Sequence, residues 1–144
     1  MANLIHSILP HPRRPITYTH PDVSVAQCVD IMVQGNIGAL VVTDDDNVLG
    51  ILSERDIVRS LVNKGLSPTS TKVSEIVHAD ITVLQSSDTV EKAMEAITYT
   101  QRRHILVAEE GKIVAILSIG DLLFNFLEEN RRVIEHLEHY IHTY

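Results

Sequence analysis

The sequence predicts a mixed α/β fold made of two tandem strand–helix–strand–strand–helix units and an extended C-terminal helix. Three observations predict it: the sequence repeats, each copy alternates short apolar runs with amphipathic stretches, and an apolar stripe continues past the second copy. Shifted by 65 residues, the chain aligns with itself without a gap. Identical pairs include Ile16/Ile81, Thr17/Thr82, Val25/Val90, Ser53/Ser118 and Asp56/Asp121. We therefore predict a first unit at residues 1–65 and a second at 66–144.

Each copy is predicted to begin with a strand and a helix. Apolar runs at Ile16–Tyr18 and Ile81–Leu84 predict the strands. Ser24 and Thr89 precede the helical patterns, and a hydroxyl there can accept a hydrogen bond from a first-turn N–H group. Cys28 falls on the apolar face of the first helix, so we expect it in the core.

Two further strands and a second helix complete each copy. The predicted strands are Ala39–Thr43 and Val48–Ser53, then His104–Ala108 and Lys112–Ser118. They are almost continuously apolar, which predicts that both sheet faces are covered. Glu54–Lys64 predicts a helix that ends before Gly65, and its counterpart runs from Asp121 toward Tyr144. Stacking the two half-sheets about a pseudo-twofold axis would bury the remaining apolar surface and leave a cleft lined by equivalent positions.

A short segment precedes each copy. Val73–Val77 resembles Ile5–Leu9, and both are expected to form a helical turn that enters the copy following it. Gly65–Lys72 is the linker, rich in Gly, Ser, Thr and Pro.

Composition excludes several classes of function. The net charge is −7, which disfavours nucleic acid, because such proteins neutralise phosphates with Lys and Arg. No apolar run approaches the roughly 20 residues that span a bilayer, and Met1–Arg14 lacks the pattern of a secretory leader. With one cysteine and no such signal, we expect a cytoplasmic protein. Hydrolase, nucleotide-loop and zinc-protease motifs are absent from the sequence, so we do not expect an enzyme.

Two short motifs carry a family resemblance. Gly50–Ile57 (GILSERDI) resembles the strand-to-helix motif G-h-h-[ST]-x-x-D of the cystathionine-β-synthase (CBS) domain, where h is an apolar residue. Ala115–Leu122 (AILSIGDL) is similar, with Ala in place of Gly. The chain is thus identified as similar to a stand-alone pair of CBS domains, a Bateman module, from about Leu4 to Leu127. The resemblance implies a βαββα fold in each half, adenosine-containing ligands, and assembly of two pairs into a disc-shaped dimer.

The resemblance leads to a functional hypothesis. We expect a regulatory sensor that binds AMP, ADP, ATP or S-adenosylmethionine between the repeats and signals through a change in conformation or assembly. No cofactor is required, although Mg could accompany the nucleotide, and the regulated partner is unknown. The alternative is a ligand-free scaffold that dimerises through CBS-type surfaces.

Candidate ligand-binding residues come in pairs. Asp56 and Asp121 are expected to accept hydrogen bonds from ribose hydroxyls, with helix capping as the alternative. Ser53 and Ser118 stand at the strand ends, where they can reach ribose or phosphate or cap the helix. The remaining candidates are Thr17 and Thr82 for base or ribose, and Arg103, His104 and Arg55 for phosphate. Exposed surface positions are the alternative for all of them.

The last helix predicts an interface. Its apolar stripe comprises Leu123, Phe126, Leu127, Ile134, Leu137 and Ile141. A stripe of that size normally marks a contact surface, so we expect a homodimer with this helix in or beside the contact. His136, His139 and His142 lie three apart, but they drift off one face, and no metal site is expected.

Overall fold

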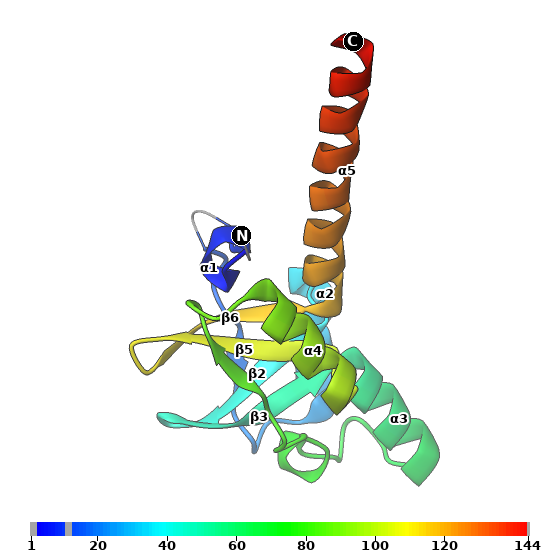
Figure 1. Ribbon diagram of the computed structural model, residues 1–144. Coiled ribbons are helices and arrows are strands. Elements are labelled where there is room, and N and C mark those ends of the chain that lie inside the picture. Colours follow the sequence, from blue (N-terminus) through cyan, green and yellow to red (C-terminus); the bar gives the residue numbers. More distant parts are fainter. Residues whose placement is uncertain (1–2, 11–12, 144) are drawn as a thin grey trace. The chain divides into compact units, whose positions relative to one another are not determined.

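The computed structural model describes residues 3–10 and 13–143 (Figure 1). The chain forms two compact units. One unit is Arg14–Thr82; the other joins the residues up to Arg13 with those from Val83 onward. The predicted boundaries, 1–65 and 66–144, describe sequence similarity and stay a prediction, as does packing about a pseudo-twofold axis.

The unit Arg14–Thr82 contains one sheet and two main helices. Strands β1 (Tyr18–Thr19), β2 (Ala39–Asp44) and β3 (Asn47–Ser53) form the sheet in that order; helices α2 (Val25–Gly35) and α3 (Glu54–Lys64) and the short 3₁₀ helix η1 (Val73–Glu75) complete the unit. Strand β1 is parallel to β2, and β2 is antiparallel to β3. The first strand, predicted at Ile16–Tyr18, begins two residues later and ends one residue later, because only Tyr18 and Thr19 pair with β2.

The other unit repeats this arrangement. Its elements are α1 (Ile5–Ile8), β4 (Val83–Gln85), α4 (Val90–Thr100), β5 (His104–Glu109), β6 (Lys112–Ser118) and α5 (Ile119–Thr143). The sheet has the order β4-β5-β6, with the same parallel and antiparallel pairings. The repetition extends to irregularities: Val42/Thr43 and Val107/Ala108 mark equivalent bulges, and Asn36 and Gln101 both end their helices with left-handed backbone. The predicted fold class is confirmed in these features.

Equivalent apolar residues form the two cores. In one unit they come from α2, β2, β3, α3 and η1: Val25, Cys28, Met32, Leu40, Val42, Leu52, Ile57, Val73 and Ile76. In the other they come from the segment that contains α1 and from β4, α4, β5, β6 and the start of α5: Ile5, Leu9, Leu84, Val90, Ala93, Ile97, Ile105, Val107, Leu117 and Leu122. All of residues 39–42 and 105–108 are buried, which confirms that both faces of these strands are covered.

Each short entry segment packs against the other repeat than the one predicted: the first segment joins the second repeat, and the second segment joins the first repeat. Ile5 and Val90 donate backbone hydrogen bonds to Asp88 and Asn3, at 2.9 and 2.8 Å, so the first segment joins the second repeat. Conversely, Val73 N–H donates to the carbonyl of Val23 at 2.9 Å, and the linker carbonyl of Thr71 accepts from Val25. The prediction that each segment enters the copy following it was wrong. Both segments have the same apolar pattern, so either could fill either core.

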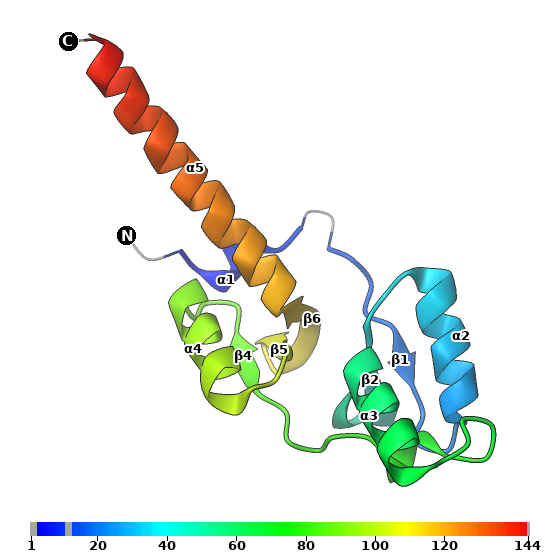
Figure 2. The same cartoon turned by 90° about the vertical axis from the view of Figure 1, so that its right-hand side faces the viewer.

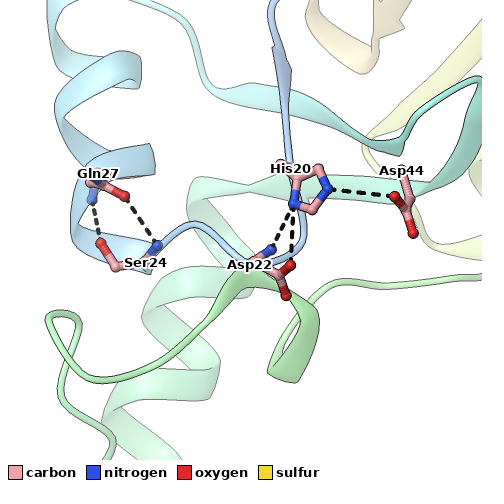
Figure 3. Close-up of polar contacts among 5 residues, drawn as sticks. All are labelled: His20, Asp22, Ser24, Gln27 and Asp44. Atoms are coloured by element: carbon pink, nitrogen blue, oxygen red, sulfur yellow. Dashed lines mark hydrogen bonds and ion pairs between the residues drawn. The ribbon is translucent and has the colours of Figure 1, made fainter.

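The start of α2 shows how local polar contacts fix the chain. Ser24 Oγ accepts from the N–H of Gln27 at 3.2 Å, and the Gln27 side chain accepts from the N–H of Ser24 at 3.3 Å, which confirms the predicted cap (Figure 3). Nearby, His20 Nδ1 accepts from the backbone N–H of Asp22. The neutral ring then carries its hydrogen on Nε2, which lies 3.4 Å from Asp44 Oδ1. These contacts tie the end of β1 to the end of β2.

Cys28 is part of the core, as predicted. Its side chain is fully buried and its Sγ lies 3.5 Å from Thr19 Oγ1. Burial raises the pKa of the thiol, because the thiolate would lose its hydration, and the hydroxyl of Thr19 offsets part of this effect.

Candidate functional site

The predicted site residues of the first repeat gather at one end of its sheet. Ala39, which begins β2, pairs with Ser53, which ends β3. Thr17 directly precedes β1, and its carbonyl accepts from the N–H of Val41 at 3.1 Å. Arg55 lies half-buried in the first turn of α3. The sheet therefore brings Thr17, Ser53 and the start of α3 to the same edge.

The carboxylate of Asp56 makes three polar contacts. Its Oδ2 accepts from the backbone N–H of Ser53 at 3.2 Å and from the Ser53 hydroxyl at 2.7 Å. Its own N–H donates to Ser53 Oγ at 3.2 Å, which completes a capping box at the start of α3. The capping interpretation of Ser53 and Asp56 is thus confirmed, whereas their role toward a ligand stays a prediction.

His78 provides the third contact, and it was not among the predicted site residues. Its Nε2 lies 3.0 Å from Asp56 Oδ1, and the Asp56 side chain is only 14% exposed. His78 lies just after η1, so the entry segment that packs on this unit leads directly into the imidazole. Alignment of Val73 with Ile5 places Pro10 opposite His78, and this difference between the segments was the available signal.

Gly50 explains how His78 comes so close. The backbone of His78 bridges Ile51 of β3, and its carbonyl oxygen lies where a Cβ atom of residue 50 would stand. Such a Cβ would also come within 2.9 Å of Val77 Cγ2. Glycine is therefore required at this position by close backbone approach rather than by its φ angle.

The second repeat has a similar polar end. Ser118 N–H donates to Asp121 Oδ2 at 2.9 Å, and Asp121 N–H donates to Ser118 Oγ at 3.0 Å. His104, at the start of β5, pairs with Ser118 across the strands. The carbonyl of Arg103 accepts from Ile119 N–H at 2.8 Å while its side chain is exposed. The structure thus brings Arg103 and His104 to the Ser118–Asp121 cap.

Three further observations bear on the predicted site and its chemistry. Thr82 is half-buried and directly precedes β4. It is the last residue of the compact unit Arg14–Thr82.

Across residues 3–10 and 13–143, no group of three or more His, Cys, Asp or Glu side chains is placed to hold a metal ion. Within the same ranges, no helix combines the length and apolarity needed to span a bilayer.

Comparison with known proteins agrees with this architecture. The family model of the CBS domain matches residues 5–63 and again residues 73–128. The mitochondrial CBS domain-containing protein CBSX3 of Arabidopsis thaliana is 34% identical over 126 residues, which are 83% of this chain and 61% of that protein. The chain therefore spans less than two thirds of that relative's length.

Solved structures show the same fold. A CBS-domain protein from Agrobacterium tumefaciens is 32% identical with a TM-score of 0.79, covering 85% of this chain and 98% of that one. A CBS domain pair in complex with 5′-methylthioadenosine and S-adenosyl-L-methionine is 18% identical, with a TM-score of 0.77, and covers 90% of this chain and 99% of that one. At that identity the likeness concerns the fold alone. The two matched segments and the two equivalent units together show that this chain belongs to the CBS domain family and carries a pair of CBS repeats.

Proposed function

We propose that this chain is a regulatory module that binds an adenosine-containing ligand at the polar sheet ends of its two repeats. The observation that supports this most is the repeated Ser–Asp cap. Each cap combines an acidic side chain, a hydroxyl and helix N–H groups at a sheet end. These groups suit the neighbouring hydroxyls and phosphates of a nucleotide, since a carboxylate accepts from ribose and N–H groups donate to phosphate.

Asp56 and Asp121 would accept from the ribose hydroxyls. A carboxylate has about four lone-pair sites. At Asp56, two of these are used by Ser53 and one faces His78, so ribose would share the carboxylate with existing contacts or displace one. Thr17 and Thr82 would contact the base or ribose from the chain that leads into β1 and β4.

Phosphate recognition would come from Arg103, His104 and Arg55. The exposed guanidinium of Arg103 at the edge of β5 suits phosphate oxygens, and His104 would add a donor. We therefore propose AMP, ADP or ATP, the last with Mg, as ligands alongside S-adenosylmethionine. The related pair solved with methylthioadenosine and S-adenosyl-L-methionine supports the adenosine moiety as the shared part.

Signalling would follow from differential affinity. A ligand shifts a conformational equilibrium only as far as it binds one state more tightly than the other. We propose that binding changes the arrangement of the two units within a cytoplasmic homodimer, and that a partner protein reads this change. No bond-breaking step is proposed.

The test combines a thermal-shift panel with calorimetry. AMP, ADP, ATP, S-adenosylmethionine, NAD and GTP are compared on the parent protein, and adenosine-containing compounds should raise the melting temperature. The better ligand is then titrated into Asp56→Ala and Asp121→Ala, with Asp46→Ala of the exposed β2–β3 turn as a control that also removes one carboxylate. At least one cap variant should lose more than about tenfold in affinity.

The scaffold hypothesis makes the opposite prediction. If no compound in the panel stabilises the parent protein, the ligand proposal is wrong and a ligand-free interaction module is favoured. If both cap variants bind as tightly as the parent, the ribose assignment fails while the ligand proposal stands.

A further inference from the structure

The distal half of α5 has no packing partner in its own unit. Every residue from 130 to 142 is exposed, and the helix extends beyond the rest of that unit (Figure 2). Its largest exposed apolar side chains include Leu127, Ile134, Leu137 and Ile141, at 54–69% exposure. An isolated helix of about 12–15 residues is marginally stable in water, and most helices in proteins depend on burial of an apolar face. This half of α5 therefore needs a partner surface.

The apolar positions follow a coiled-coil spacing. We define the seam of α5 as six positions separated alternately by four and three residues: Leu123, Leu127, Asn130, Ile134, Leu137 and Ile141. This is the a/d pattern of a heptad repeat, whose period of 3.5 keeps one stripe facing a second helix. Phe126, Val133 and Tyr140 flank the seam on one side and widen the surface that a partner would bury.

From these observations we infer that α5 associates with α5 of a second copy of this chain, as a parallel coiled coil in register through this seam. The charges along α5 are compatible with the pairing of two identical helices. Arg131 pairs within its own helix with Glu128 and Glu135, at 2.9 and 3.0 Å. In a parallel pair, the heptad positions beside the seam place Arg131 next to Phe126 of the second copy and Glu138 next to its Val133. Like charges do not oppose one another across the seam.

Asn130 selects the orientation. It is the one polar residue among the six seam positions. A parallel pair in register places the two Asn130 amides opposite each other, where each can donate to and accept from the other. In antiparallel alignments that match the apolar layers, Asn130 faces an apolar residue, namely Leu127, Ile134 or Ile141. A buried amide without a partner is costly, so the parallel arrangement is favoured.

Matched lysine variants of the full chain test the seam. Leu137→Lys and His139→Lys place the same charge two residues apart in α5, one in the seam and one away from it. Light scattering at tens of micromolar should give the parent and His139→Lys equal masses, at least twice that of Leu137→Lys. Because Leu137 is exposed within its unit, the fold of that unit should survive, whereas the helical circular dichroism should fall as the distal half of α5 loses its partner. A monomeric parent, or a Leu137→Lys variant of unchanged mass, would overturn the inference.

A cysteine placed near the end of the helix tests the orientation. Ile141→Cys should form an intermolecular disulfide under mild oxidation, mapped to residue 141 by mass spectrometry, because the two copies of this position meet only in the parallel register. Antiparallel alignments separate them by more than about 15 Å, at a rise of about 1.5 Å per residue. The buried Cys28 does not compete. Association without this crosslink would overturn the parallel assignment, and neither result depends on nucleotide binding.

Discussion

The imidazole of His78 lies 3.0 Å from the carboxylate of Asp56, so the two proposed ribose-binding aspartates are not equivalent. Asp56 and Asp121 make the same contact with the serine at the end of their strand. The segment packed on the Asp56 unit supplies a histidine, however, whereas the corresponding segment of the other unit has Pro10. A difference between entry segments thus becomes a difference between the two caps.

This difference should appear in stability. Asp121→Ala should cost about 0.5–2 kcal/mol, the usual range for loss of a capping interaction. Asp56→Ala should cost about 1 kcal/mol more, because it also removes the contacts with His78 and the Ser53 hydroxyl. Urea unfolding of the two variants at pH 7 without nucleotide measures the difference. Equal losses would mean that the His78 contact adds nothing to the stability of this unit.

A second matched pair concerns the close approach at β3. Gly50→Ala should destabilise by about 1–3 kcal/mol, because the added methyl group collides with the His78 carbonyl and must displace that segment. Ala115→Gly is the control in the equivalent strand position, where the natural residue already has a Cβ atom. It should cost about 1 kcal/mol or less, from backbone entropy. Hydrogen exchange at residues 76–78 should rise in Gly50→Ala only.

Arg103 should distinguish phosphorylated from unphosphorylated ligands. Arg103→Ala should weaken AMP, ADP or ATP by about 1–3 kcal/mol and leave adenosine nearly unchanged, because adenosine has no phosphate. The parent's affinity for nucleotide should also fall more steeply with salt than its affinity for adenosine. Calorimetry at two salt concentrations measures both effects. If Arg103→Ala weakens adenosine and AMP equally, the residue supports the fold or the base instead.

The ion pair between Arg13 and Glu109 should make stability depend on pH. Arg13 Nη2 lies 2.5 Å from Glu109 Oε1, and this hydrogen bond lowers the pKa of Glu109 below its ordinary value of 4.5. A lowered folded-state pKa stabilises the protein above about pH 4.5, and the contribution is lost as the pH falls through the folded value. Arg13→Gln should therefore be less stable than the parent at pH 7. The difference in free energy of unfolding between the two proteins should become smaller below pH 4. If this difference in stability stays constant down to pH 3, Arg13 acts through packing instead.

The sequence predicted the features that depend on local pattern. Ser24 begins its helix because a hydroxyl there accepts a first-turn N–H, and β2 is buried because its apolar residues run without a break. The repeat also identified Ser53 and Asp56 as the equivalents of Ser118 and Asp121, and the Ser and Asp of each repeat form a helix cap. These are short-range properties that any stretch of chain carries with it.

The sequence did not predict which contacts form between segments that are far apart in the chain. The apolar patterns of Ile5–Leu9 and Val73–Val77 are alike, so nothing local decides which core each one fills. The same choice determines that His78 reaches Asp56. The prediction for the first strand failed for a related reason, since only two residues pair there and the apolar run extends beyond them.

The exchange of entry segments also sets an order of assembly during synthesis. The unit Arg14–Thr82 is one continuous stretch, so it can fold once residue 82 has left the ribosome. Ile5 and Leu9, although made earlier, must wait for β5, β6 and the first turn of α5 before their core exists. An apolar segment that is made before the unit Arg14–Thr82 is therefore among the last to be buried. It closes a loop of roughly 80 residues, at an entropic cost that grows only slowly with loop length.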